Sequence, residues 1–221
     1  MKKLFVGVLC VALSLSVQGK EVNMTSPDGK YQFTLSDSGG QLHYSLTWNG
    51  KQTVKPSLLG INANVEWRDG VEIGTVDSSR KDTIWHPVYG ERSEIKDCYH
   101  AWKIVVNRQN GRDKLILDVR AYDEGIAFRY HFPGGQYLKI TDEYTEYTMP
   151  EGTKAYFTPK AQTPYSYLPL ENWPGESDRP LLLTLADGGY VCLAEAQVVD
   201  YVRTKFNVSP TKKNTVISAM Y

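Results

Sequence analysis

Glu195 is the side chain whose position most clearly suggests chemistry. It ends a predicted strand over residues 190–195, and side chains alternate between the two faces of a strand, so Glu195 shares a face with Val191 and Leu193. A carboxylate on an otherwise apolar face is costly to bury unless a cation, hydrogen-bond donors or a partner surface accompanies it. The alternative is that Glu195 emerges into water where the strand ends, as most charged side chains do.

A β-hairpin positions this carboxylate. The run from residue 181 to residue 185 is rich in leucine, and Asp187-Gly188-Gly189 separates it from the strand that carries Glu195. A tight hairpin turn requires positive φ angles, which an Asp-Gly pair supplies. The sequence therefore predicts two antiparallel strands, residues 181–185 and 190–195, joined by this turn.

A second group of acidic side chains has the residue types for glycoside hydrolysis, which requires two carboxyl groups facing each other across the scissile bond. Glu171, Glu176 and Asp178 lie near Trp173 in a proline-rich stretch, residues 163–180. The prolines predict an irregular loop, and clustered acids in a loop are usually solvated. We therefore expect a solvated cluster and assign no catalytic residue.

Other kinds of chemistry find no support in the sequence. The histidines show no close pair with the spacing of a zinc site, and neither a nucleophile elbow nor a phosphate-binding glycine loop is present. The histidines in question are His43, His86, His100 and His131. Basic and acidic residues balance at 25 each, which argues against the strongly basic surface that binds nucleic acid.

The first nineteen residues have the pattern of a secretory signal peptide. Lys2 and Lys3 precede an apolar core over residues 4–17, and Val17-Gln18-Gly19 suits a cleavage site. No later segment reaches the ~20 apolar residues that a membrane-spanning helix needs. We therefore expect residues 1–19 to be removed and residues 20–221 to form an exported domain, periplasmic or extracellular and not held in the membrane.

Two cysteines lie in the exported part, Cys98 and Cys192. An exported protein can oxidise such residues, but one pair is no disulfide framework, and the pairing cannot be deduced from sequence. A bridge and two free thiols both remain open.

Short strands separated by turn residues follow one another along the exported part. Tyr31, Phe33 and Leu35 alternate along residues 30–36, and Asn49-Gly50 is a strong hairpin signal. No segment keeps apolar residues at helical spacing over three turns, so helix should be scarce. Strands about ten residues apart predict an all-β fold, a large antiparallel β-sandwich.

Some segments carry more specific expectations. Residues 61–67, 138–149 and 215–221 each predict one strand, whereas the polar and charged residues 68–82 favour a loop. Residues 85–102 mix aromatic side chains with dense charge, which is unusual for a plain strand. The last strand reaches the end of the chain without a capping turn, so we expect a truncated product with an unfinished edge strand there.

Several short motifs, in order, resemble the N-terminal domain of glycoside hydrolase family 97. Leu193-Ala194-Glu195-Ala196, followed by Val199-Asp200-Tyr201, matches a signature of that domain. The earlier motifs are TSPDG at 25–29, KPSLLG at 55–60, PVYGE at 87–91 and YDEGIAFRY at 122–130. The similarity runs from about Thr25 to the end of the chain. It implies a large β-sandwich of the galactose-mutarotase-like type, in agreement with the strand pattern.

Enzymes of family 97 cleave α-glucosidic or α-galactosidic bonds and depend on calcium. The resemblance implies that Glu195 reaches over to the catalytic domain as a calcium ligand, and we transfer no other site residue. Calcium takes six to eight oxygen ligands, so this chain alone should bind it poorly. The family's catalytic (β/α)₈ barrel needs ~250 further residues, and the catalytic carboxylates belong to it.

The resemblance thus predicts a non-catalytic domain, carbohydrate-binding or structural, that lines the substrate pocket of a secreted α-glycosidase. Its expected partners are a carbohydrate and the missing catalytic barrel. A free-standing glycan-binding module and a non-functional gene remnant are the alternatives. Some aromatic side chains have the shape to stack on sugars, although packing is their commoner role. They are Trp85, Trp102, Tyr165, Tyr167 and Trp173.

Overall fold

Strands account for nearly all the regular structure of this chain. The computed structural model describes residues 19–134, 137–199 and 201–220, and these contain eighteen β-strands, two short 3₁₀ helices and no α-helix. The predicted signal peptide lies outside the described residues except for Gly19. Within the described part, no helix has the length and apolar character to cross a membrane.

The elements in chain order are β1 (Glu21–Thr25), β2 (Tyr31–Ser36), η1 (Ser38–Gly40), β3 (Leu42–Trp48), β4 (Lys51–Leu59), β5 (Ile61–Ala63), β6 (Val65–Glu66), β7 (Val71–Trp85), β8 (Ile95–Arg108), β9 (Lys114–Tyr122), β10 (Gly125–His131), β11 (Ile140–Glu143), β12 (Glu146–Thr148), β13 (Lys154–Phe157), β14 (Ser166–Pro169), η2 (Leu170–Asn172), β15 (Leu181–Thr184), β16 (Tyr190–Leu193), β17 (Thr204–Val208) and β18 (Thr215–Met220).

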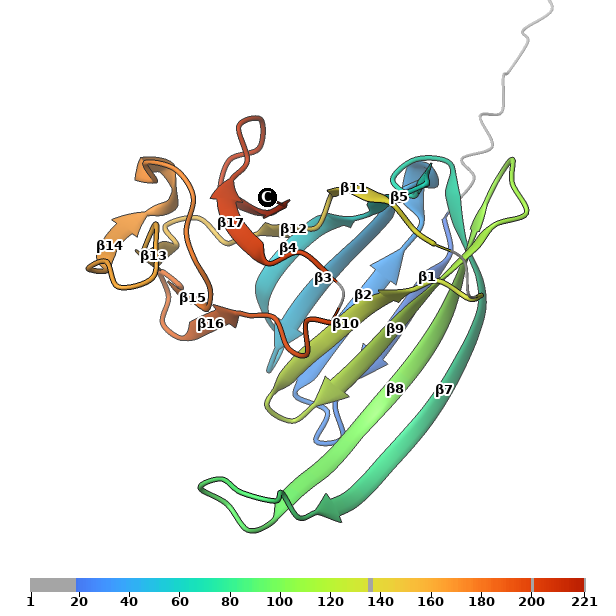
Figure 1. The fold of residues 1–221 in the computed structure, drawn as a ribbon, viewed down its shortest axis with the longest axis horizontal. Coiled ribbons are helices and arrows are strands. Elements are labelled where there is room, and N and C mark those ends of the chain that lie inside the picture. Colours follow the sequence, from blue (N-terminus) through green and yellow to red (C-terminus); the bar gives the residue numbers. More distant parts are fainter. Residues whose placement is uncertain (1–18, 135–136, 200, 221) are drawn as a thin grey trace, which may run out of the picture.

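These strands form antiparallel sheets, which confirms the predicted fold class. A seven-stranded sheet has the order β1-β2-β3-β4-β12-β18-β17, and a four-stranded sheet has the order β10-β9-β8-β7. Figure 1 shows these two sheets packed face to face as a sandwich. A small sheet, β11-β5-β6, lies at one end, and a further four-stranded sheet, β14-β13-β15-β16, forms a lobe at the side.

The core fills the space between the two large sheets. Alternate side chains of β2 and β9 point inward, so that Phe33, Leu35, Leu115 and Leu117 are all buried. The Phe33 ring stacks on the Tyr44 ring of the neighbouring strand, with centroids 5.1 Å apart. Each such side chain contributes about 1.5–3 kcal/mol by leaving water. The period-two pattern of the sequence therefore identified the buried faces correctly.

Both predicted hairpin turns form. Asn49 and Gly50 have φ angles of 49° and 75°, as a two-residue turn between β3 and β4 requires. Gly188 and Gly189 have φ angles of 93° and 96° between β15 and β16. These positive angles explain why the turn signals were informative.

The prediction of a loop over residues 68–82 is wrong from Val71 onward, and only residues 68–70 lack strand structure. Val71–Trp85 is β7, the longest strand, and it pairs along its length with β8. Only its first part carries buried apolar residues, Val71 and Ile73, whereas residues 77–85 are exposed on both faces apart from the pairing. A strand that is wet on both faces shows no alternation, so its sequence resembles that of a loop.

The remaining corrections concern boundaries. Residues 61–67 form two strands, β5 and β6, and residues 138–149 contribute β11 and β12 to different sheets. The loop expected over residues 163–180 contains β14 and η2. Residues 215–220 form β18 as predicted, but β18 lies between β12 and β17 and is no edge strand; β17 occupies the edge.

Candidate functional site

Glu195 lies just beyond the strand on which the alternation placed it. β16 ends at Leu193, and residues 194–203 then cross to β17 without regular structure where they are described. Within this connection Gln197 has a φ of 52°, and Val198 and Val199 are exposed. Tertiary contacts, and not the strand pleat, therefore set the direction of the Glu195 carboxylate.

Those contacts are an ion pair and a backbone hydrogen bond. Arg179 Nη1 lies 2.8 Å from Glu195 Oε2, and the backbone N–H of Thr204 donates to the same oxygen at 3.2 Å. Arg179 Nη1 also donates to the Thr204 carbonyl at 3.0 Å, so one guanidinium links the segment before β15 to the start of β17. The Glu195 side chain is only 18% exposed. Its cation and donors are thus within this chain, and it does not simply emerge into water.

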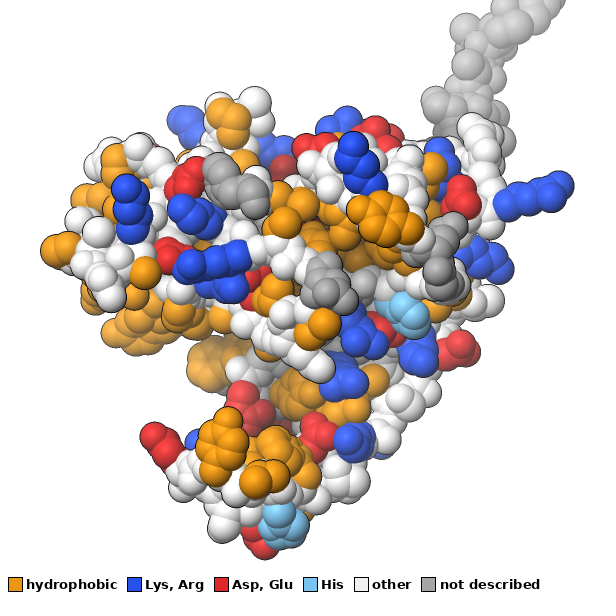
Figure 2. Space-filling view, viewed as in Figure 1, with side chains coloured by type: hydrophobic (Ala, Val, Ile, Leu, Met, Phe, Trp, Pro, Cys, Tyr) orange, Lys and Arg blue, Asp and Glu red, His pale blue; other side chains and the backbone are white. Residues whose placement is uncertain are grey.

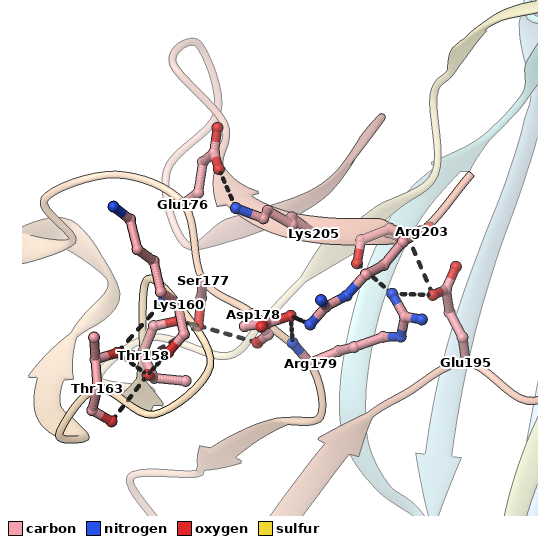
Figure 3. Close-up of polar contacts among 11 residues, drawn as sticks. Thr158, Lys160, Thr163, Glu176, Ser177, Asp178, Arg179, Glu195, Arg203 and Lys205 are labelled. Atoms are coloured by element: carbon pink, nitrogen blue, oxygen red, sulfur yellow. Dashed lines mark hydrogen bonds and ion pairs between the residues drawn. The ribbon is translucent and has the colours of Figure 1, made fainter. Parts of the chain in front are cut away.

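Asp178, next to Arg179, carries a second ion pair. Its carboxylate accepts hydrogen bonds from the Arg203 guanidinium and from the backbone N–H of Arg179. Burial by itself raises the pKa of Asp178, but these two hydrogen bonds and the charge of Arg203 outweigh it and hold the pKa below its usual value. We call Glu195, Arg179, Thr204, Asp178 and Arg203 the Glu195 network (Figure 3).

The far end of the 194–203 connection is anchored by Tyr201. Its hydroxyl donates to Glu143 Oε2 at 2.7 Å, and Thr145 Oγ1 donates to Glu143 Oε1, also at 2.7 Å. Burial, followed by the nearby negative charge of Glu143, raises the pKa of the Tyr201 hydroxyl, so it acts as a hydrogen-bond donor. This contact gives a physical role to the tyrosine of the Leu193–Tyr201 signature: it fixes the connection that presents Glu195.

The other acidic candidates do not form a pair that faces across a cleft. Glu171 lies exposed on η2, Asp178 pairs with Arg203, and Glu176 pairs with Lys205 at 2.9 Å. Trp173 packs against Phe157, with ring centroids 5.4 Å apart. These contacts explain the charges locally and offer no opposed acid and base.

The aromatic candidates divide into two groups. Trp102 and Trp173 pack against the core, whereas Trp85, Tyr165 and Tyr167 are exposed. Cys98 and Cys192 are free thiols, which resolves the question that the sequence left open.

Among the described residues, no cluster of side chains around Glu195 could hold a metal ion by itself. No group of three or more His, Cys, Asp or Glu side chains gathers anywhere in the described part of the chain. Arg179 and Thr204 contact only Oε2 of Glu195, and in Figure 3 the other carboxylate oxygen points away from Arg179. Calcium takes six to eight oxygens, so one carboxylate cannot by itself complete such a site.

The sequence singled out Glu195 but not most of the residues that contact it. Arg179 and Glu143 gave no signal, because nothing in a sequence states which of many charged residues will face each other across separate loops. Tyr201 was within reach, since it belongs to the same signature as Glu195.

The fold is an antiparallel β-sandwich with a small lobe at its side, and the Glu195 network ties the segment before β15 to the start of β17. The Glycosyl-hydrolase 97 N-terminal family model matches residues 24–221. The chain therefore belongs to the N-terminal domain family of glycoside hydrolase family 97.

Individual relatives agree with this assignment. A retaining alpha-galactosidase of Bacteroides thetaiotaomicron is 30% identical over 159 residues, which cover 70% of this chain and 23% of that protein. A family 97 enzyme from Pseudoalteromonas sp. strain K8, solved with panose, superposes with a TM-score of 0.83 at 22% identity. A beta-arabinopyranosidase superposes with a TM-score of 0.81, also at 22% identity. The chain covers 32% and 35% of these two solved chains, so it spans about a third of their length.

Proposed function

We propose that this chain is the N-terminal domain of a secreted α-glycosidase in which it lines the carbohydrate pocket and donates Glu195 as one calcium ligand to a site shared with the catalytic domain. The observation that carries the proposal is the geometry of Glu195. One carboxylate oxygen is held by Arg179 and the Thr204 N–H, while the other points away from them. Such an arrangement orients a single ligand atom for a cation at a domain boundary.

The position of Arg179 also leads us to expect that the isolated chain binds calcium poorly. A guanidinium 2.8 Å from Glu195 Oε2 already neutralises much of the carboxylate charge, so a lone divalent cation gains little there. Further carboxylates from a second domain restore a net negative site. Arg179 then acts as a positioning residue, because it fixes the orientation of Glu195 without itself contacting a substrate.

The residues of this chain bind and orient; they do not supply the acid and base of hydrolysis. The described carboxylates that the sequence singled out pair with Arg203, Lys205 and Arg179 or lie exposed on η2. When bound, calcium would supply a fixed positive charge at the boundary between the two domains. We therefore expect no hydrolysis of aryl α-glucosides or α-galactosides by the isolated chain.

Calcium titration of two proteins tests the proposal. In the isolated chain, millimolar calcium should shift the midpoint of thermal unfolding by less than about 1 °C, because stabilisation follows RT ln(1 + [L]/Kd) and Kd is large. The second protein is a full-length chimera in which residues 20–221 replace the matching N-terminal part of the Bacteroides α-galactosidase. There, Glu195→Gln should raise the calcium concentration needed for half-maximal activity at least about tenfold.

Glu176→Gln is the matched control in the chimera, since it removes a carboxylate of the same lobe that pairs with Lys205. It should leave the calcium requirement unchanged. A chimera whose calcium requirement is equally insensitive to Glu195→Gln would contradict the proposed ligand. A large calcium-induced rise in the unfolding midpoint of the isolated chain, abolished by Glu195→Gln, would show that this chain holds a complete site of its own.

A further inference from the structure

A group of exposed apolar side chains lies at the end of the β7–β8 hairpin. Ile84, Trp85, Val88 and Tyr89 lie within six residues of one another and are 60%, 49%, 100% and 91% exposed. Figure 2 shows hydrophobic side chains gathered at the lower end of the molecule, where Figure 1 places the end of this hairpin. Large apolar side chains grouped at the surface of a folded domain usually mark a binding surface. We call the paired residues 77–85 and 95–103 the arm, and residues 84–89 the arm tip.

The hairpin that carries the arm tip is a braced structure and not a loose loop. Residues 77–85 of β7 pair in continuous register with residues 95–103 of β8. Lys81 pairs with Asp97 at 2.6 Å across the two strands, and the Arg120 guanidinium lies over the Tyr99 ring, 4.6 Å from its centroid. The arm therefore holds its tip in a fixed position beyond the sandwich (Figure 1).

The contacts that hold this part of the hairpin do not contribute to the hydrophobic core. The side chains of residues 77–85 are exposed, so neither face of this part of the strand packs against the seven-stranded sheet. Within the loop, His86 Nδ1 lies 3.1 Å from the Ser93 carbonyl and closes the turn locally. An ordered projection with an apolar end contributes nothing to the stability of the isolated domain. Its apolar side chains suit a complementary surface on a binding partner.

The shape and composition of the arm tip favour a protein partner over a sugar. Sugar sites combine aromatic faces with several convergent polar groups, usually in a concave pocket. Here the surface projects outward, and two of its four large side chains, Ile84 and Val88, are aliphatic. A projecting group of Trp, Tyr and aliphatic side chains resembles the anchors that fill pockets at the centre of protein interfaces.

We propose that the arm tip docks into an apolar depression on the catalytic domain of the longer enzyme. The inference rests on the proposed function and names a second contact between the two domains, separate from Glu195. A catalytic domain is the favoured partner because this chain matches only about a third of each solved relative and 23% of the curated one. Most of the mass of those proteins therefore lies outside the matched part. A rigid arm in contact with the catalytic domain would resist rotation of one domain relative to the other.

Thiol labelling of Val88→Cys tests the proposal. In the isolated chain this position is fully exposed and should react with a maleimide at the rate of a free thiol. In the full-length chimera described above, labelling should slow by at least about tenfold, because the thiol becomes accessible only when the interface opens. Tyr165→Cys, at an exposed position of the side lobe, is the control and should change less than about twofold. Both are made in a chain whose Cys98 and Cys192 are replaced by serine.

The outcomes separate the two claims. A chimera that is active and calcium-dependent but labels Val88→Cys at the isolated-chain rate would overturn the docking and leave the proposed function standing. Equal slowing at Val88 and Tyr165 would also overturn it. Slowing that depends on the concentration of the isolated chain would assign the arm tip to a second copy, and slowing by a soluble α-glucan would assign it to carbohydrate; either result replaces the proposed partner. If the chimera fails to fold, a cysteine at the matching hairpin position of the intact α-galactosidase gives the same decision.

Discussion

The Glu195 network and the β7–β8 arm place side chains in opposite environments. In the network, the two carboxylates are largely withdrawn from water, with Asp178 buried and Glu195 mostly covered, and each has a counter-ion. In the arm, Trp85, Val88 and Tyr89 are held out in water. Both arrangements depart from the usual distribution of charged and apolar residues.

The difference lies in where each region finds its partners. The charges of the network are satisfied within this chain, so its energetics belong to the stability of the isolated domain. The described contacts of the arm brace its strands but leave its tip uncovered, so the apolar tip contributes little to that stability. Substitutions in the two regions should therefore separate clearly in an unfolding experiment on this chain alone.

Among substitutions in these two regions, the largest effect on stability is expected at Arg179. Arg179→Met leaves the mostly covered Glu195 carboxylate without its counter-ion and removes the donor to the Thr204 carbonyl. We expect the free energy of unfolding to fall by about 2–3 kcal/mol, less than for a fully buried pair because both groups retain some exposure. Urea unfolding at neutral pH measures it.

A double-mutant cycle shows whether the cost arises from the unpaired charge. Adding Glu195→Gln to Arg179→Met should restore about half of the lost free energy, because the uncompensated carboxylate is gone. An additive double mutant would mean that Arg179 stabilises the fold by packing or through Thr204 and not through Glu195. The Glu195 network would then lose its central pair, and the contrast with the arm would have to rest on Asp178.

A smaller, pH-dependent effect is expected at Asp178. Its pKa is lowered in the folded chain, so the folded state favours the charged carboxylate. Its contribution is complete above the ordinary aspartate pKa of about 4 and declines as the pH falls through the lower folded value. Asp178→Asn should therefore cost about 1 kcal/mol at pH 7, since Arg203 is half exposed and water screens its charge, and progressively less in acid.

Unfolding curves between pH 7 and pH 3 measure this difference. Asp142→Asn, at an exposed position of β11, is the control and should show no comparable convergence with the unmodified chain in acid. A cost at Asp178 that stays constant over the whole range would mean that the carboxylate is stabilising through geometry alone and that its charge is not part of the network.

The two regions also differ in how far the sequence predicted them. The hairpin of β15 and β16 was predicted because a buried leucine-rich strand and an Asp-Gly turn are local signals, and Glu195 followed from the same segment. Its exact setting was not, since β16 ends two residues earlier than the alternation suggested. The partners of Glu195 come from a separate loop and from the next strand, and such long-range pairings leave no local trace.

The arm was missed for a different reason. Strand prediction relies on alternation between a buried face and a solvent-exposed face, and residues 77–85 are solvent-exposed on both faces. Backbone pairing with β8 holds them extended, and that pairing is invisible in the side-chain pattern. The mixture of aromatic and charged residues over 85–102 did mark the segment as unusual, and it corresponds to the arm tip and the start of β8.

The smallest effect on stability is expected at the arm tip. Val88→Ser and Tyr89→Ser should each change the free energy of unfolding of the isolated chain by less than about 0.5 kcal/mol, because these side chains are exposed and lose no packing. Leu117→Ala, in the sandwich core, is the contrast and should cost about 2–5 kcal/mol. Urea unfolding should show the same dependence on denaturant for both tip variants as for the unmodified chain, since the surface exposed on unfolding barely changes.

The two serine substitutions together should reduce self-association at high concentration, measured by sedimentation, because they remove part of the exposed apolar surface. A loss of more than 1 kcal/mol from either one would mean that the tip packs against its own sandwich in solution, and the arm would then be a stabilising element of this domain like the network with which it is contrasted.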